Sequence, residues 1–379
     1  MDFNLTKEQE TIRDIAKKIA EKSILPVINE FEESHSFPAG IIRELAGLGF
    51  MGMNIKEEYG GLDAGTVAYS LAVTEIARAS ASVAVTMSVT NMVAEVIQEF
   101  AREEIKKKYL PPLCDGTYLA GAFCLTEPNA GSDAGAIQTR AEKVEGGYLL
   151  NGSKIFITSA EVAGVFVVWA VTDKNRGKKG ISAFLVPKDA KGLIIGKKEE
   201  KMGQCASPTN EVALSDCFVP EDHMLGEEGD GYKIALMELA GGRIGIASLS
   251  LGVGYAAIDY AKSFAKERVQ FGKPISELQA IQFMLSDCYT ELDAARMLVL
   301  RAAFLKEKGL SYTKEGSMAK LYASEVANRV CIKAVQILGG YGYSKEYPLE
   351  RYLRDIKVTT IYEGTSEVQR IVIAREILD

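Results

Sequence analysis

The carboxylate best placed for chemistry is Glu363, in the sequence IYEGTS at positions 361–366. It follows an apolar run and precedes a Gly-Thr-Ser turn that opens the last predicted helix. A glutamate here can be an ordinary solvated turn residue, or an anion that stabilises a helix N-terminus. In an apolar pocket, the same carboxyl would have a raised pKa and could act as a general base. The spacing alone leaves these alternatives open.

A second candidate is the sequence LTEPNAGSD at positions 125–133, which is dense in turn formers and hydroxyls. These residue types favour a capped surface loop in any protein. The functional alternative is a loop whose backbone N–H groups and hydroxyls bind a flat polar ring or a phosphate. The residues alone favour the surface loop.

A third candidate is the sequence GGYGY at positions 339–343, which follows an apolar helical run. Glycine after such a run is typical of a helix C-cap. The alternative is that the missing side chains let the backbone approach a ligand closely. The spacing does not match a phosphate-binding fingerprint, so the C-cap is the better interpretation.

The composition excludes several other functions. A net charge of −7 over 379 residues offers no basic field for a phosphate backbone, so nucleic acid is not an expected partner. His35 and His223 are the only histidines, which disfavours a histidine triad or a metal site and leaves carboxylates, Tyr, Lys or a cofactor for acid-base chemistry. The six cysteines are scattered, without a C-x-x-C pair, and are expected to be free thiols.

The N-terminus, MDFNLTKE, shows no export signal, and we expect a cytoplasmic protein. The longest uncharged stretch, residues 79–94, is shorter than the ~20 apolar residues that a spanning helix needs. We therefore expect no membrane insertion, and we interpret this stretch as a buried helix.

The elements that must position these motifs begin with helices. Thr6 to Gln9 fits a capping box, and Pro26 interrupts the helix that follows. Further helices are predicted in 38–48, 65–100 and 103–109, with the Gly60-Gly61 and Pro111-Pro112 pairs as breaks.

From about residue 116 the pattern changes to short β-branched runs between turn signals. Asn151-Gly152 predicts a type I′ hairpin turn, and residues 166–171 and 181–186 predict two further strands. The helical period returns after residue 231, with helices near 231–267, 277–307, 313–338 and 366–377. The predicted class is α+β, divided into 1–115, 116–228 and 229–379. Without strand-helix alternation, a Rossmann domain is disfavoured.

Four motifs occur together in a fixed order: TEPxAGSD at 126–133, ERxxFG at 267–272, QxxGGxG at 336–342 and YEGTS at 362–366. Their combination resembles the acyl-CoA dehydrogenase family over the whole chain, and especially its short-chain, butyryl-CoA dehydrogenase-like members. The resemblance implies an N-terminal helical domain, a central β-barrel or sandwich domain and a C-terminal four-helix bundle. It also implies a homotetramer built as a dimer of dimers.

The resemblance implies FAD as the cofactor and assigns residues to it. Those expected around the isoalloxazine end are Phe123, Leu125, Thr126, Ser132, Phe156, Ile157 and Thr158. Those expected at the adenine and diphosphate end, on a neighbouring subunit, are Arg268, Phe271, Gln336, Gly339 and Gly340. Thr365 and Glu367 are expected to touch the cofactor again. The implied substrate contacts are Ser132, Arg243, Tyr362 and Gly364.

The resemblance also implies a mechanism. Glu363 would take the α-proton of an acyl-CoA while the β-hydrogen leaves as hydride to flavin N5, giving a 2-enoyl-CoA. The thioester carbonyl would accept hydrogen bonds from the Glu363 N–H and an FAD ribityl hydroxyl. Some relatives carry the base at position 242, which is glycine here. The expected electron acceptor is an electron-transferring flavoprotein.

The expected substrate is a short-chain or compact acyl-CoA. The alternatives are a branched, cyclic or dicarboxylic acyl group, an acyl-CoA oxidase, and a non-catalytic flavoprotein. The sequence does not set the physiological direction, and three departures from the family pattern leave the substrate open. Ala240 stands where many short-chain members have aspartate, Phe156 where several have tryptophan, and Gln204-Cys205 where a hydrophobic-basic pair is expected.

Overall fold

The computed structural model describes residues 4–378. Met1 to Phe3 and Asp379 lie outside the described residues. Met1 to Phe3 begin the segment that we interpret as lacking an export signal.

The N-terminal part is helical, as predicted. It contains α1 (Lys7–Ile19), α2 (Ile28–Ser34), α3 (Ala39–Gly47), α4 (Thr66–Ala79), α5 (Ala81–Phe100) and α6 (Glu103–Cys114). The capping box is confirmed, because the Thr6 hydroxyl accepts from the Gln9 N–H at 3.2 Å and the Gln9 side chain accepts from the Thr6 N–H at 3.0 Å. The apolar face of α1 is buried in the main core.

Two boundaries in this part differ from the prediction. Residues 65–100 form two helices, because Ser80 adopts an extended conformation and its hydroxyl accepts from the Val83 N–H at 3.1 Å. This cap starts the buried helix at Ala81, two residues later than predicted. The Pro111-Pro112 pair does not break α6, which continues to Cys114 because Leu110, Leu113 and Cys114 are packed into a buried cluster.

Within the described residues, eight strands form one sheet. They are β1 (Ala120–Cys124), β2 (Arg140–Val144), β3 (Gly147–Thr158), β4 (Ala163–Val171), β5 (Ile181–Pro187), β6 (Leu193–Lys198), β7 (Thr209–Pro220) and β8 (Met224–Leu225). Their order is β6-β7-β3-β2-β4-β5-β8, with β1 paired to β4. Alternate residues of β4 enter two different buried clusters, so this central strand is covered on both faces.

The predicted hairpin turn at Asn151-Gly152 is wrong, because β3 runs through both residues. The turn lies instead at Glu145-Gly146, where Val144 pairs with Gly147 and Gly146 has φ 79°. Gly152 serves a close approach, since a Cβ there would lie 2.4 Å from the Thr139 hydroxyl oxygen. The two strands predicted at 166–171 and 181–186 are confirmed as β4 and β5.

The C-terminal part contains the four predicted long helices, α7 (Gly231–Glu267), α8 (Gln279–Glu307), α9 (Thr313–Leu338) and α12 (Ser366–Leu378). The prediction missed the short helices α10 (Gly340–Tyr343) and α11 (Leu349–Lys357), and a small hairpin of β9 (Val269–Gln270) and β10 (Lys273–Pro274). By length and composition α7 could cross a membrane, but 83% of its most apolar window is buried inside the protein.

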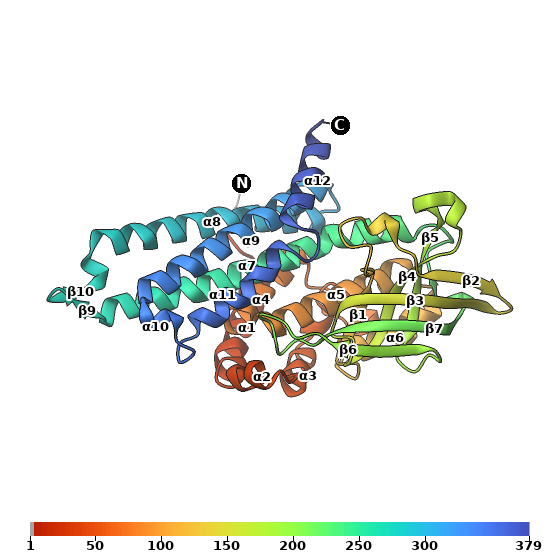
Figure 1. Cartoon of the computed structure of the whole chain (residues 1–379), viewed down its shortest axis with the longest axis horizontal. Helices are drawn as coiled ribbons and strands as arrows, with labels where there is room; N and C mark the ends of the chain where they lie inside the picture. Colours follow the sequence, from red (N-terminus) through yellow and green to blue (C-terminus); the bar gives the residue numbers. More distant parts are fainter. Residues whose placement is uncertain (1–3, 379) are drawn as a thin grey trace.

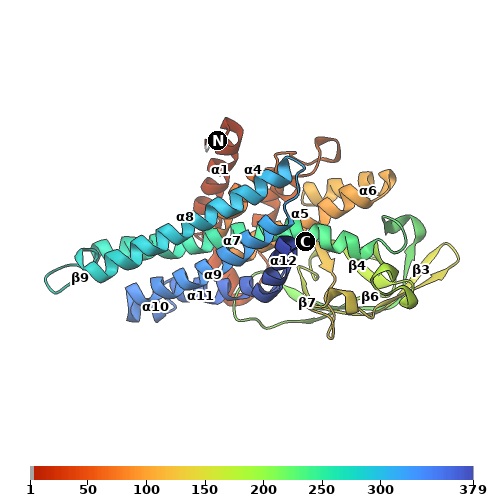
Figure 2. The ribbon, with the colours of Figure 1, turned by 90° about the horizontal axis from the view of Figure 1, so that it is seen from above.

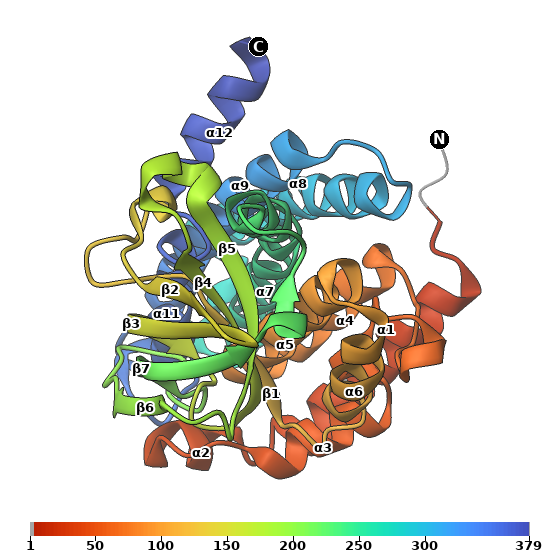
Figure 3. The same cartoon turned by 90° about the vertical axis from the view of Figure 1, so that its right-hand side faces the viewer.

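The helices α7, α8 and α9 run side by side along the long axis, with the β9-β10 hairpin at one end and the sheet at the other (Figures 1 and 2). Figure 3 looks along this axis, with the strands on one side, α1, α4 and α6 on the other, and α12 projecting from the body.

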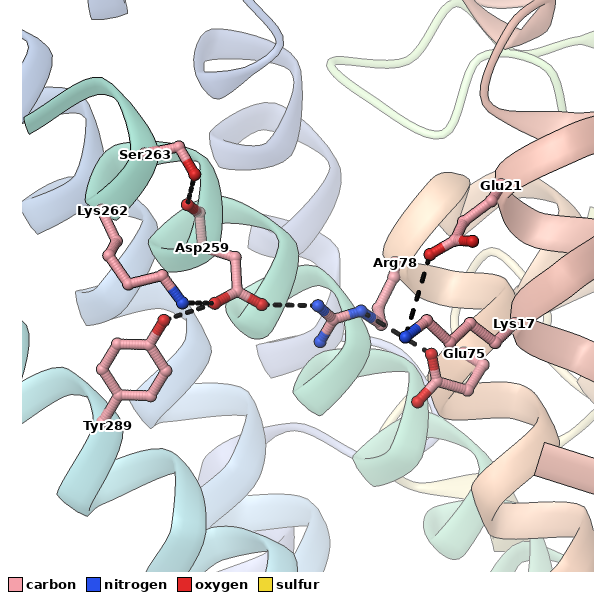
Figure 4. A network of polar contacts seen from close by, with 8 residues as sticks. All are labelled: Lys17, Glu21, Glu75, Arg78, Asp259, Lys262, Ser263 and Tyr289. Atoms are coloured by element: carbon pink, nitrogen blue, oxygen red, sulfur yellow. Dashed lines mark hydrogen bonds and ion pairs between the residues drawn. The ribbon is translucent and has the colours of Figure 1, made fainter. Parts of the chain in front are cut away.

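A polar network joins the N-terminal helices to this bundle (Figure 4). Arg78 of α4 donates to Asp259 of α7 at 2.5 Å, and Tyr289 of α8 donates to the same carboxylate. Lys262 lies 2.7 Å from Asp259 as well. Buried core and polar network together fix α7 against α4 and α8. All six cysteines are buried free thiols, as expected.

Candidate active site

Glu363 lies in the turn between η8 (Val358–Thr360) and α12. It adopts a left-handed backbone conformation, with φ 53°, which is costly for a residue other than glycine. Side chains from two helices hold the turn: Gln369 Nε2 donates to the Glu363 carbonyl at 3.2 Å and to the Gly364 carbonyl at 2.9 Å. Lys320 Nζ, from α9, donates to the Gly364 carbonyl at 2.7 Å. The surrounding structure therefore imposes the backbone conformation of Glu363.

The carboxyl group of Glu363 points inward. Its Oε2 is buried and has no hydrogen-bond partner among the described residues. A Cβ at Gly242 of α7 would lie 2.3 Å from this oxygen and 2.7 Å from the Sδ of Met92 of α5. The carboxyl therefore lies against the backbone of α7, in a space that only glycine leaves open. Glu363 as a whole is half-buried, but this carboxyl oxygen is shielded from solvent, unlike that of an ordinary solvated turn glutamate.

Burial raises the pKa of Glu363 to about 7, and the positive charges of Lys320 and Arg243 oppose the rise. Burial in turn lowers the pKa of Lys320 to about 8. A carboxyl with a pKa near neutrality can accept a proton from a substrate and release it again at working pH. The pKa of Glu363 therefore suits a general base.

Arg243 lies beside this carboxyl on α7 and is itself buried. Its Nη1 donates to the Ser317 hydroxyl at 2.9 Å, while its Nε is buried without a partner among residues 4–378. A buried donor without an acceptor costs free energy unless a ligand satisfies it. Tyr362 is held from another direction, because its hydroxyl accepts from Gln204 Nε2 at 3.2 Å.

The loop at 125–133 is joined to β3 rather than free at the surface. The Ile155 N–H donates to the Thr126 carbonyl at 3.0 Å. Lys154, which is fully buried, lies 2.7 Å from Glu127 Oε1 and 3.3 Å from the Leu125 carbonyl. The Glu127 carboxylate also accepts from the backbone N–H groups of residues 138 and 139. Sequence reasoning missed this ion pair, although a lysine within the apolar strand was the available signal.

The residues predicted for the isoalloxazine end gather around this junction of loop and strand. The register of β3 against β7 shifts between Lys154 and Ile157, which takes Phe156 out of the ladder and leaves its side chain 61% exposed. Thr126 and Thr158 are half-buried, Leu125 and Ile157 are buried, Ser132 is exposed, and Phe123 of β1 packs on Trp169 with ring centroids 4.3 Å apart. An exposed aromatic ring flanked by hydroxyls and backbone fits a flat polar ring system.

The residues predicted for the adenine end lie elsewhere. Arg268 follows α7, and its guanidinium lies 5.3 Å from the centroid of the Tyr341 ring in α10. Phe271 is 90% exposed, and Gln336, Gly339 and Gly340 are exposed at the end of α9, where Gly339 forms the predicted C-cap. This end of the bundle is opposite the sheet (Figure 1). One chain therefore does not bring the two groups together.

Two further predicted contacts lie beside Glu363. The Thr365 hydroxyl accepts from the Val368 N–H at 3.3 Å at the start of α12, and Glu367 is exposed one position after the buried Ser366. Ala240 is buried on α7, close to the site, and provides no polar group there.

Three family models match the chain: the acyl-CoA dehydrogenase N-terminal domain over residues 6–117, the middle domain over 122–217 and the C-terminal domain over 229–378. The chain belongs to the acyl-CoA dehydrogenase family. The resemblance, the three-part fold and the enzyme class predicted from the sequence are thus confirmed: this is an oxidoreductase that dehydrogenates acyl-CoA, and its family implies a flavin.

Within the family, the chain is 46% identical to the short-chain specific acyl-CoA dehydrogenase of Clostridium acetobutylicum, with 100% of both chains covered. The structure of butyryl-CoA dehydrogenase from Megasphaera elsdenii is 47% identical over 100% of both chains, with a TM-score of 0.98. The same values describe the match to a chain from a structural study of the electron transferring flavoprotein of Acidaminococcus fermentans.

Proposed function

We propose that this chain dehydrogenates a short-chain or compact acyl-CoA with FAD as cofactor, and that Glu363 is the general base. The observation that carries the proposal is the buried Oε2 of Glu363, which lies against Gly242 and has no hydrogen-bond partner within residues 4–378. Any group at position 242 larger than hydrogen would occupy the space of this carboxyl. Glu363 is therefore the base that this site can accommodate.

The chain's own residues provide the proton chemistry. The Glu363 carboxylate removes the α-proton, and its raised pKa makes the protonated form accessible near neutral pH. Lys320 and Arg243 add positive charge close to the Glu363 carboxyl, which favours its deprotonated, proton-accepting form. When bound, FAD supplies the hydride acceptor for the β-hydrogen. The left-handed turn at Glu363 orients the carboxyl and the N–H of the same residue toward one substrate.

The packing on α7 beside Gly242 supports a compact acyl group. A Cβ at Gly245 would lie 2.4 Å from the Ser88 hydroxyl and 2.5 Å from the Tyr69 hydroxyl, so these side chains pack directly on α7 three residues beyond Gly242. Three residues advance a helix by about 4.5 Å. A Cβ at Gly241 would lie 2.8 Å from Lys306 Nζ. This close packing on α7 around Gly242 favours a compact acyl group over a long one.

The charges around Lys306 disfavour a dicarboxylic acyl group. Lys306 Nζ already lies 2.5 Å from Glu95 Oε2, and Glu238 is buried nearby with an unpartnered Oε1. Burial, with Glu95, raises the pKa of Glu238 well above its usual value. A second substrate carboxylate would find no free cation here, because Lys306 is already paired with Glu95.

We also propose a homotetramer in which the Arg268 end of one subunit contacts the FAD of another. Phe271 is exposed and lies between β9 and β10, and this hairpin is at the end of the bundle away from the sheet (Figure 1), which supports the arrangement. We propose an electron-transferring flavoprotein as the electron acceptor. We also propose that the protein is cytoplasmic. The similarity to butyryl-CoA dehydrogenase supports the short-chain assignment.

The experiment is an anaerobic titration of the yellow, flavin-loaded protein with a panel of straight, branched, cyclic and dicarboxylic acyl-CoA thioesters. We expect butyryl-CoA and similar compact thioesters to bleach the flavin, and long-chain and dicarboxylic thioesters to have little effect. Preferential bleaching by a long-chain thioester would contradict the compact site. Admitting air to the reduced protein separates the alternatives, because rapid peroxide formation would indicate an oxidase.

A further inference from the structure

The connection between β6 and β7 contains residues 203–207, here called the junction loop, where the three parts of the chain meet. Its backbone is pressed against α11, since a Cβ at Gly203 would lie 2.5 Å from the carbonyl carbon of Arg354. On its other side it contacts α2 and α5. The loop contains Gln204 and Cys205, which depart from the family pattern.

Glu32 of α2 anchors the loop. Its Oε2 accepts from the N–H groups of Cys205 at 2.7 Å and Ala206 at 3.1 Å, and its Oε1 accepts from the Ser82 hydroxyl at 2.5 Å. These bonds to a buried carboxylate are charge-assisted and resist displacement. The loop backbone is therefore fixed without a basic side chain at position 205.

Gln204 forms hydrogen bonds to the C-terminal part through both its backbone and its side chain. It is buried, with a left-handed φ of 51°. Its N–H donates to Asp355 Oδ1 at 2.5 Å, and its Nε2 donates to the Asp355 carbonyl at 3.1 Å and to the Tyr362 hydroxyl at 3.2 Å. One amide group thus connects the end of α11 to the residue that directly precedes Glu363.

We propose that Gln204 is a positioning residue for the reaction: its amide fixes the Tyr362 ring and, through it, the turn that aims the Glu363 carboxyl. The inference rests on the proposed role of Glu363. Tyr362 and Glu363 share a peptide unit, and the left-handed conformation of Glu363 has to be imposed by its neighbours. Lys320 and Gln369 donate hydrogen bonds to the carbonyls of this turn, and Gln204 donates one to the side chain of Tyr362, which directly precedes it.

The test is a double-mutant cycle on the flavin-loaded, full-length protein. The variants are Gln204→Met, which keeps length without a donor, Tyr362→Phe, which removes the acceptor, and both together. Glu104→Met, which introduces methionine at an exposed position of α6, is the control. The measurement is stopped-flow anaerobic flavin reduction by butyryl-CoA, giving the limiting rate, the apparent substrate Kd and the pH profile of the rate.

We expect Gln204→Met and Tyr362→Phe each to lower the limiting rate roughly tenfold to a hundredfold, since an ångström of misplacement of a catalytic group can cost this much. The apparent Kd should stay within about twofold in Gln204→Met, because Gln204 is not among the expected substrate contacts. The midpoint of the pH profile should move in both variants, while Glu104→Met keeps the wild-type rate and midpoint. The double variant should lose no more than the worse single variant, because both remove one interaction.

A wild-type limiting rate in Gln204→Met, or independent losses that multiply in the double variant, would overturn the inference. If Gln204→Met does not retain FAD, Tyr362→Phe decides alone, and a wild-type rate and pH midpoint there would overturn it. These results differ from a failure of the proposed function, in which the wild-type flavin itself would not be reduced by any acyl-CoA.

Discussion

Replacing Gly242 with alanine tests the placement of the catalytic carboxyl without touching the carboxyl itself. The new Cβ would lie 2.3 Å from Glu363 Oε2, whereas ordinary contacts begin at 3.4 Å, so the carboxyl must retreat by about 1.1 Å. The Met92 side chain lies 2.7 Å from the position of this Cβ, so the carboxyl cannot move in that direction. A displacement of about 1 Å at a reacting group can cost on the order of a hundredfold in rate.

The same substitution should not weaken the helix. Gly242 lies inside α7, where alanine is intrinsically favoured over glycine by roughly 0.5–1 kcal/mol. Gly40 provides the matched control, because it lies in helix α3 and a Cβ there would meet nothing within 4 Å. Gly40→Ala should keep full activity, and Gly242→Ala should lose activity with a melting temperature close to that of the wild type.

The assay is anaerobic flavin reduction under saturating butyryl-CoA, alongside thermal unfolding of the flavin-loaded protein. The expected result is a limiting rate reduced roughly a hundredfold in Gly242→Ala alone. A wild-type rate in this variant would show that the base is not constrained by α7, and the reasoning about the site would be wrong. A rate loss that only accompanies unfolding would be equally inconsistent with it.

Three further predictions follow from the charges. The rate of flavin reduction at limiting substrate should rise about tenfold per pH unit up to about pH 7 and then level off, because Glu363 acts only when deprotonated. A rate that does not change between about pH 5 and pH 8 would contradict this prediction. Lys320→Met should move that rise to higher pH, since the lysine charge lowers the pKa of Glu363, and an unchanged midpoint in the stopped-flow pH profile would contradict the assignment. Lys154→Met should reduce the free energy of unfolding in denaturant titrations by about 3–5 kcal/mol, because it leaves Glu127 buried without its cation. Adding Glu127→Gln should recover part of this loss. A loss below about 1 kcal/mol in Lys154→Met would refute the stabilising role of the pair.

The sequence pattern predicted the long elements because their periodicity extends over many residues. It failed where a single contact decides the conformation. Asn151-Gly152 has the composition of a turn, yet the approach of Thr139 requires the glycine inside a strand. The Pro111-Pro112 pair remains helical because the apolar side chains around it are buried in the core.

In the candidate site, too, the sequence predicts some features and misses those that depend on a tertiary contact. Glu363 could be identified by its motif, but its burial against Gly242 depends on three helices that are far apart in sequence. Lys320 and Gln369 were not predicted, because a lysine and a glutamine on helices carry no signal that they will hold a turn. The Lys154–Glu127 pair likewise becomes visible only when β3 lies against the 125–133 loop.

The most direct test of the central claim compares wild-type protein with Glu363→Gln in an anaerobic titration with butyryl-CoA. The variant keeps the size of the side chain and should bind FAD and the thioester, because the change removes basicity alone. We predict rapid bleaching of the flavin in the wild type and none in Glu363→Gln on the same timescale. Bleaching of Glu363→Gln at a rate close to that of the wild type would show that another group removes the α-proton.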